Sequence, residues 1–377
     1  MNILHVIPSL SKGGAERLTI DICNALTDKG HNVMLLSMSP INAYSFIDFN
    51  FKYKVISSKV VPSLSGKTQA NTHEYEDVIR QFKPHIIHSH LFVAEMLTRY
   101  KPHPGIKYFT HLHDNMPQFN GIKIQKMNKS VITNFYEKQL LIRRYKQCNN
   151  NFVAISQDAY DFFFNQLGNT LAKRIFLLNN AIDYNRFYRG KRKFDYTENT
   201  TLRMVSVGSL VKKKNQQFLV DIALELKKLN LNFHIDILGD GPEYDSIKNK
   251  ITNSQVQQHL TLHGNVNNVE DFLHQSLIYV HPASYEPFGL VLLEAMAAGL
   301  PCVCLDGRGN RDIIKNDFNG YIFKEQDAAQ FAKTILNLFN QREKLQTMSN
   351  NAIDFAADFD MANYTERLLN LYNKVTA

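Results

Sequence analysis

The sequence predicts an α/β protein built from two doubly wound parallel sheets. Short apolar strands alternate with helical patterns, the alternation occurs as two separate series, and a polar stretch at Asn179–Asn199 lies between them. Alternating strands and helices form parallel sheets through right-handed crossovers. The length of 377 residues also suits two domains better than one.

The first series begins at the N-terminus and is expected to form a domain over residues 1–183. Its expected strands are short runs rich in apolar residues. They are Ile3–Ile7, His31–Met38, Lys54–Ser57, His85–Ser89, Tyr108–His111 and Phe152–Ile155. The clearest helical patterns between them are Ala15–Thr27 and Thr72–Gln81.

The second series starts near Thr201 and is expected to form a domain over residues 184–355. Its strands repeat the same apolar pattern, and glycine turns follow several of them. They are Arg203–Val207, His234–Leu238, Leu260–Leu262, Leu277–His281, Cys302–Leu305 and Gly320–Phe323. The end of the chain, Asp354–Ala377, is expected to form one or two helices.

The composition indicates a globular protein without a signal peptide or a membrane span. No apolar run approaches the roughly 18–20 residues that a spanning helix needs. Cys302 and Cys304 flank Val303 in an apolar run, so we expect buried free thiols and a cytoplasmic location. The net charge of +8 is concentrated in part of the sequence.

The basic part is the segment 121–148, which has seven Lys or Arg residues and a single acid, Glu137. Apolar residues are interleaved with these bases. A basic amphipathic segment of this kind is typical of helices that lie on an anionic membrane. A solvated helix with one apolar stripe toward the core fits the pattern equally well. Nucleic-acid binding is not favoured, because no recognition motif accompanies the charge.

Two carboxylates, Glu286 and Glu294, flank a Pro-Phe-Gly turn that follows an apolar strand. In open α/β sheets, ligands bind at this carboxyl edge of the strands. Eight residues on a helix rise about 12 Å, whereas a glycosidase pair stands about 5 Å or roughly 6.5–9.5 Å apart. We therefore expect the two acids to contact different parts of one extended ligand.

In each series, a glycine-containing loop follows the first strand. Gly13 and Gly14 precede a helix, whose free backbone N–H groups can bind an anion or a sugar, although a plain tight turn fits as well. Gly208 and Ser209 precede three lysines that end at Lys214. A lysine beside such a loop suits a diphosphate, while a solvated lysine run is the alternative.

Histidines gather near the strand ends of the first series, at His85, His88, His90, His111 and His113. Because no cysteine or acid stands at ligand spacing beside them, we do not expect a metal site or another cofactor. His113 closes a strand, so its side chain is expected to reach a ligand in the cleft.

Together these segments resemble the retaining glycosyltransferases of family four, which have the GT-B fold. Glu286–Glu294 matches the family's Glu-x7-Glu motif. The other matching segments follow in the family's order: Gly13–Glu16, Thr110–Asp114, Asn180–Asp183, Gly208–Lys214, Gly239–Pro242 and Gly309–Gly320. The resemblance implies two Rossmann-like domains that face a central cleft, with a helix over 356–377 that packs back on the N-terminal domain.

The resemblance also implies roles for particular residues. Glu286, His113 and Lys214 would serve catalysis, with Lys214 on the diphosphate and His113 near the sugar. Glu286 and the backbone of Phe288–Leu290 would together hold the sugar and phosphate. Glu294 would bind the ribose. The full donor-binding set would be Gly13, Gly14, Ser209, Lys214, Glu286, Phe288, Gly289, Leu290 and Glu294.

The implied reaction moves a sugar from a UDP- or GDP-linked donor to a hydroxyl of a glycan or a lipid-linked acceptor, without a metal. From the basic segment 121–148 we further expect a role in surface polysaccharide or glycolipid biosynthesis at the inner face of the cell membrane. Ser209 stands where the family usually has an arginine, so Lys212 or Lys213 would take over part of the diphosphate clamp. Two alternatives remain, a sugar synthase with a soluble acceptor and a nucleotide-sugar-binding subunit without catalysis.

Overall fold

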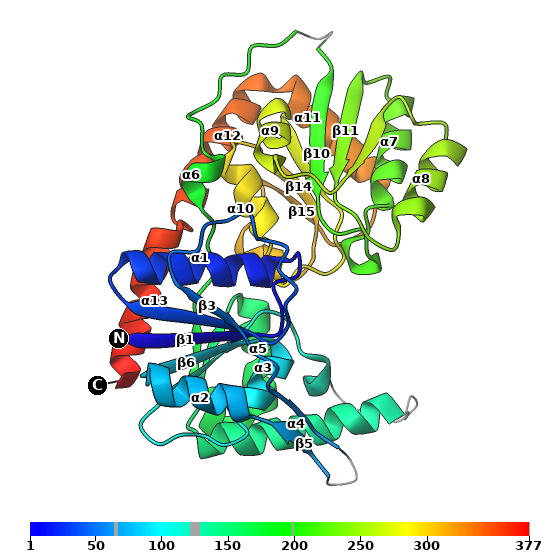
Figure 1. Ribbon diagram of the computed structural model, residues 1–377. Coiled ribbons are helices and arrows are strands. Elements are labelled where there is room, and N and C mark those ends of the chain that lie inside the picture. The colour runs from blue at the N-terminus through cyan, green and yellow to red at the C-terminus, as the bar shows by residue number, and fades with distance from the viewer. Residues whose placement is uncertain (64–66, 121–128, 198–199, 377) are drawn as a thin grey trace. The chain divides into compact units, whose positions relative to one another are not determined.

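The computed structural model describes residues 1–63, 67–120, 129–197 and 200–376 (Figure 1). The chain divides into two compact units. Unit 1 comprises Met1–Ala181 and Met361–Ala377, and unit 2 comprises Ile182–Asp360. Each unit contains one parallel sheet with helices on its faces, so the predicted doubly wound α/β fold class is confirmed.

Unit 1 is built on a seven-stranded sheet in the order β3-β2-β1-β6-β7-β8-β9. Neighbouring strands are parallel throughout. The strands are β1 (Asn2–Ile7), β2 (Asn32–Ser37), β3 (Lys52–Val55), β6 (Ile86–His90), β7 (Lys107–Leu112), β8 (Asn151–Ala154) and β9 (Ile175–Leu177). A separate antiparallel pair consists of β4 (Lys59–Val61) and β5 (Gln69–Asn71).

The helices of unit 1 cover both faces of this sheet. They are α1 (Gly14–Asp28), α2 (His73–Phe82), α3 (Leu91–Thr98), α4 (Lys129–Gln147), α5 (Gln157–Ala172) and α13 (Met361–Thr376). Ile3 and Ile7 of β1 share a buried cluster with residues of α1 and α13. Leu4 and Val6 share another with α2 and α3. This alternation is the period of two that a strand imposes on its side chains.

Helix α13 is the C-terminal helix of the chain and belongs to unit 1. It packs beside α1, as Figure 1 shows in red and blue. Leu368 and Tyr372 are fully buried in the same cluster as Leu18 and Ile22 of α1. An amphipathic C-terminal helix therefore completes one face of the first sheet.

Unit 2 has a six-stranded parallel sheet in the order β12-β11-β10-β13-β14-β15. Its strands are β10 (Leu202–Val207), β11 (Phe233–Leu238), β12 (Leu260–Gly264), β13 (Ile278–His281), β14 (Cys302–Leu305) and β15 (Gly320–Phe323). Its helices are α6 (Tyr184–Phe187), α7 (Phe218–Lys228), α8 (Tyr244–Asn253), α9 (Val269–Gln275), α10 (Leu290–Ala297), α11 (Ala328–Asn340) and α12 (Arg342–Ala357). Each predicted strand of the second series is present.

Both sheets contain a point at which the strand order reverses. In unit 1 it lies between β1 and β6, and in unit 2 between β10 and β13. Crossover helices leave in opposite directions at such a point, so a crevice opens beyond the carboxyl ends of the two strands. The loops after these four strands are therefore where each unit is expected to hold a ligand.

The basic segment 121–148 is only partly described, since residues 121–128 lie outside the described ranges. The rest forms α4. Ile132 and Phe135 on this helix are 48% and 46% exposed. Two of the bases of this segment have hydrogen-bond partners within the fold. Lys138 donates to Gln166 at 2.6 Å, and buried Arg144 donates to the carbonyl of Met96 at 2.9 Å.

Nothing in the described part of the chain forms a helix of the length and apolar character that crossing a membrane requires.

Candidate active site

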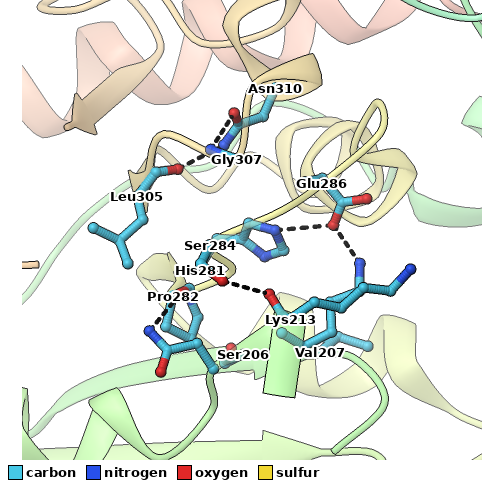
Figure 2. Close-up of polar contacts among 12 residues, drawn as sticks. Ser206, Val207, Lys213, His281, Pro282, Ser284, Glu286, Leu305, Gly307 and Asn310 are labelled. Atoms are coloured by element: carbon cyan, nitrogen blue, oxygen red, sulfur yellow. Dashed lines mark hydrogen bonds and ion pairs between the residues drawn. The ribbon is translucent and has the colours of Figure 1, made fainter. Parts of the chain in front are cut away.

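The candidate site lies in unit 2, beyond the carboxyl ends of β10 and β13. After β10 the chain makes a short 3-10 turn over Lys212–Lys214. After β13 it passes through Pro282–Tyr285 to Glu286. The carbonyl of Lys213 accepts hydrogen bonds from the backbone N–H of Ser284 at 3.0 Å and from its hydroxyl at 3.2 Å. These bonds fix the two loops against each other (Figure 2).

Two side chains contact the carboxylate of Glu286. Lys214 Nζ lies 2.5 Å from Glu286 Oε2, and His281 Nε2 lies 3.1 Å from the same oxygen. Figure 2 marks the contact between His281 and Glu286 with a dashed line. His281 is the last residue of β13, so the strand itself fixes its position. Glu286 and His281 are almost completely buried.

The charges in this cluster balance. Burial alone would raise the pKa of Glu286, but Lys214 and the hydrogen bond from His281 bring that pKa down to about 2. Burial lowers the pKa of His281, against the opposing effect of Glu286. The arrangement is therefore an ionised glutamate, a lysine cation and a neutral imidazole that donates through Nε2. His281 Nδ1 is buried and has no hydrogen-bond partner among the described residues.

The backbone around Glu286 is tightly enclosed. Its N–H donates to the carbonyl of Gly307 at 2.8 Å, and its carbonyl accepts from the N–H of Gly309 at 3.0 Å. The side chain of Asn310 holds this loop by donating to Leu305 and accepting from Gly307. A Cβ at position 309 would lie 1.9 Å from the carbonyl oxygen of Pro287. Only glycine fits there, and the loop consequently fixes the direction of Glu286.

Helix α10 starts directly after this turn. Gly289 precedes it with φ at +110° in the left-handed region, and no side chain caps its N–H groups. The N–H groups of a helix's first turn point outward along its axis and suit an anion or a hydroxyl. Phe288 is buried, whereas Glu294 is partly exposed in the second turn of the helix. The donor-binding roles of Phe288, Gly289, Leu290 and Glu294 stay predictions.

The loop after β10 contains Ser209, the position at which the family resemblance implied an arginine. Ser209 there is exposed, and its carbonyl accepts from the N–H of Val211 at 3.0 Å. Lys213 places its ammonium 5.6 Å from the ring centre of Tyr285. The backbone of Gly208 is covered closely by Gly239, where a Cβ would lie 2.0 Å from the Gly208 oxygen.

The other predicted residues lie in unit 1. Gly13 precedes α1, and its N–H and carbonyl both bond to the hydroxyl of Tyr44, at 2.9 and 2.7 Å. The carboxylate of Glu16 occupies the space beside Gly13, since a Cβ there would lie 2.4 Å from Glu16 Oε2. Gly14 is the first residue of α1. His113 follows β7 and is 8% exposed.

His113 belongs to a buried set of five imidazoles on the α1 and α13 face of the first sheet. The others are His5 on β1, His88 and His90 on β6, and His111 on β7. Burial lowers the pKa of all five rings. His85 is exposed and lies outside this set.

Three of these rings, His88, His90 and His111, bring one nitrogen each within 4.8 Å of one another. That spacing raises the question of a metal. The rings are stacked nearly parallel, at interplanar angles of 13° to 26°. Ring lone pairs lie in the ring planes, so parallel rings do not converge on one ion as a metal site requires. Both nitrogens of His90 are also already bonded to other histidines.

Reasoning from the sequence missed two features of the site. It did not single out His281, which was treated only as the end of a strand. It also left unrecognised the burial of the histidine set on a single face. A signal for the second exists, because the period of two along β1, β6 and β7 puts all five rings on one side. His281 had no such signal, since its contact depends on how the turn to Glu286 closes.

Comparison with known protein families gives two matches, one over most of unit 1 and one over most of unit 2. The family described as "Glycosyltransferase Family 4" matches residues 12–186. The family described as "Glycosyl transferases group 1" matches residues 189–355.

Among curated proteins, the chain is 21% identical to an uncharacterized glycosyltransferase of Haemophilus influenzae, over 94% of this chain and 95% of that protein. It is 26% identical to a UDP-Gal:alpha-D-GlcNAc-diphosphoundecaprenol alpha-1,3-galactosyltransferase of Escherichia coli, over 53% of this chain and 54% of the enzyme. The chain thus spans about half the length of the second relative.

Among solved structures, Anabaena HepE in complex with UDP and glucose superposes with a TM-score of 0.76, at 17% identity and 99% coverage of both chains. WaaG, a glycosyltransferase involved in lipopolysaccharide biosynthesis, gives a TM-score of 0.73 at 16% identity, over 98% of this chain and 99% of that chain. At these identities the likeness concerns the fold.

Proposed function

Because the chain belongs to the family-four type of glycosyltransferases with the GT-B fold, we propose that it transfers a hexose from a nucleotide-sugar with retention of the anomeric configuration. The observation that carries the proposal is the buried cluster of Lys214, Glu286 and His281 at the switch point of the second sheet. This crevice is where doubly wound sheets bind nucleotides.

In the proposed reaction, Lys214 holds the diphosphate of the donor, and its charge stabilises the leaving group as the bond from the sugar C1 to the phosphate breaks. The carboxylate of Glu286 holds the sugar, the backbone N–H groups of Phe288–Leu290 hold the phosphate, and Glu294 holds the ribose. The acceptor hydroxyl forms the new bond at C1, and its proton passes to an oxygen of the departing phosphate. Gly13, Gly14 and His113 contact the donor in this scheme, by the family resemblance.

The donor is a UDP- or GDP-linked sugar. Bound UDP and glucose in Anabaena HepE, and the UDP-galactose used by the Escherichia coli relative, support the UDP form. No metal takes part in the proposed scheme, because Lys214 supplies the positive charge.

The acceptor that we propose is a glycan or a lipid-linked sugar of surface polysaccharide or glycolipid biosynthesis. The diphosphoundecaprenol acceptor named for the Escherichia coli relative and the lipopolysaccharide role named for WaaG support it. The protein would then work in the cytoplasm at the inner face of the membrane. The exposed Ile132 and Phe135 of α4 are the side chains proposed to enter that surface.

The test is a transfer assay with UDP-sugars, with the product followed by NMR. We expect a product with the donor's anomeric configuration, and we expect transfer to be lost in Glu286→Ala and Lys214→Ala. An inverted product would contradict the family mechanism. Unchanged transfer in both variants would refute the site. Transfer to a free sugar phosphate would instead favour a sugar synthase, and donor binding without turnover would favour a non-catalytic subunit.

A further inference from the structure

Three of the buried imidazoles in unit 1 form a hydrogen-bonded row. His5 Nδ1 lies 2.9 Å from His90 Nε2, and His90 Nδ1 lies 2.8 Å from His113 Nε2. His5 and His90 are fully buried, whereas His113 is 8% exposed. The row therefore begins at the buried ring of His5 and ends at His113, the ring that is proposed to contact the substrate.

The direction of the hydrogen bonds in this row is fixed by Thr19. Its hydroxyl has one hydrogen, which it donates to the carbonyl of Ala15 at 2.7 Å. The same oxygen lies 3.2 Å from His90 Nδ1. Because its hydrogen is already used, the oxygen faces His90 with a lone pair. His90 Nδ1 must then carry the hydrogen, which it donates to His113 Nε2 and toward Thr19.

The remaining hydrogens follow from this assignment. A neutral His90 that is protonated at Nδ1 has a bare Nε2, which accepts from His5 Nδ1–H. His5 Nε2 is then a bare acceptor, and it is buried without a partner among the described residues. The opposite direction would leave a buried N–H unpaired at that atom, which proteins tolerate less well than an unpaired acceptor.

We propose that His90 is a positioning residue that holds His113 in the tautomer with its hydrogen on Nδ1. This inference rests on the proposed function for the role of His113 at the sugar. Its consequence is chemical. His113 Nε2 is occupied as an acceptor and Nδ1 carries the hydrogen, so the ring has no lone pair left to take a proton. His113 therefore serves as a hydrogen-bond donor to an oxygen of the sugar and is excluded as a general base.

Two neighbouring histidines, His88 and His111, differ from His90 because neither forms a hydrogen bond with a ring nitrogen of His113. His111 stacks face to face on His113, with ring centres 4.2 Å apart and an interplanar angle of 8°. His88 lies on the same strand and face as His90, but its Nδ1 contacts the hydroxyl of Tyr372 at 2.6 Å. His88 is consequently a matched control with equal burial and no bond to His113.

The experiment is nitrogen-15 NMR of the histidine rings in the full chain, with His113→Asn used to assign the His113 signals. In the wild type we expect the hydrogen of His113 on Nδ1. His90→Asn keeps an amide donor near the position of Nδ1 and should preserve that tautomer. His90→Leu should produce a mixture of tautomers, while His88→Leu should leave His113 unchanged. Thr19→Val, which is nearly isosteric, should weaken the preference even if His90→Leu does not fold.

A wild-type His113 with its hydrogen on Nε2, or a His113 signal indifferent to His90→Leu and Thr19→Val, would overturn the proposal. In the transfer assay, His90→Leu should lose about tenfold or more in rate, since a hydrogen bond of about 1.4 kcal/mol corresponds to that factor. His90→Asn should restore most of the loss. If the wild type transfers no sugar but the NMR results hold, the tautomer assignment stands and only its role in transfer falls.

Discussion

Lys214 and Glu286 form an ion pair of 2.5 Å across 72 residues of sequence, with their side chains only 17% and 8% exposed. The lysine that we assign to a diphosphate is therefore paired with a carboxylate. A diphosphate has to share or replace that partner.

The first prediction concerns the binding of UDP alone. Lys214→Ala removes a charged hydrogen bond worth about 1.5–3 kcal/mol, so the Kd for UDP should rise by about 10- to 150-fold. Glu286→Gln removes a buried negative charge near the phosphates, so the Kd should stay the same or fall. Calorimetric titration with UDP measures both. Equal weakening by both substitutions would contradict the idea that Glu286 competes with the diphosphate.

The second prediction concerns His281, whose Nε2 lies 3.1 Å from Glu286. His281→Leu removes that donor, so the pKa of Glu286 should rise from about 2. As the pH is lowered, the variant should therefore begin to lose its rate of transfer at a higher pH than the wild type does. His281→Gln, which keeps a donor close to the position of Nε2, should restore the wild-type profile. Identical pH–rate profiles for His281→Leu and the wild type would show that His281 only fills space.

The third prediction uses the close approach of two backbone segments at Gly309. Gly309→Ala would place a Cβ 1.9 Å from the oxygen of Pro287 and 2.7 Å from that of Glu286. We expect loss of transfer and destabilisation by about 2 kcal/mol or more, because the loop has to move. Gly190→Ala is the control. Gly190 has a positive φ, unlike Gly309, but it lies in open space, so this substitution should cost about 1 kcal/mol and leave transfer intact.

The sequence was sufficient for the sheet of unit 2 and insufficient for three short strands of unit 1. Strands such as Cys302–Leu305 are continuous apolar runs bounded by turns, which a local pattern detects. In contrast, β4, β5 and β9 are three residues long, and such short runs show no clear periodicity. They exist because neighbouring strands provide hydrogen-bond partners.

The same distinction applies to the candidate site. Glu286 and Lys214 could be named from local motifs, because each motif is a turn at the end of a strand. Their contact could not be predicted from local pattern, since it depends on the order of strands that puts β10 beside β13. The burial of Arg144 could not be predicted for a related reason. Its charge suggested a solvent-facing position, whereas the fold buries it against Met96.

The fourth prediction is that acid destabilises unit 1. The folded pKa of each of the five buried histidines lies below the usual 6.5, to about 3 for His5 and about 4 for His111. Below pH 6.5 these histidines bind protons in the unfolded chain but stay neutral in the folded chain. Stability is therefore lost as pH falls, by about 1.4 kcal/mol per pH unit for each neutral ring.

Glu95 acts in the opposite direction, because burial raises its pKa to about 7 and the folded chain binds its proton first. Its stabilising contribution grows as pH falls toward 4.5, but this single carboxyl group does not offset the loss of stability from five imidazoles. The melting temperature of the full chain should thus drop steeply from pH 6.5 to 5. His88→Leu should flatten that slope, while His73→Gln, at a side chain that is 83% exposed, should not. A flat wild-type profile would contradict the prediction.

The fifth prediction concerns membrane binding by α4. The exposed apolar side chains Ile132 and Phe135 lie three residues apart, and Arg143 and Lys146 are exposed further along the helix. Residues three and four apart share one helical face, so this face combines apolar contact with positive charge. The wild type should float with vesicles that contain anionic lipid and should dissociate as salt increases.

Phe135→Ser together with Arg143→Glu should abolish flotation, since each change removes one of the two sources of affinity. Lys138→Gln is the matched control, because Lys138 is engaged with Gln166 and lies 5.6 Å from the ring centre of Phe119. It removes one charge from the same helix and should leave flotation unchanged. Equal loss in the control would indicate that only net charge matters. If the wild type does not float even at low salt, the membrane proposal is contradicted and a soluble acceptor is favoured. The assignment of the active site does not depend on this result.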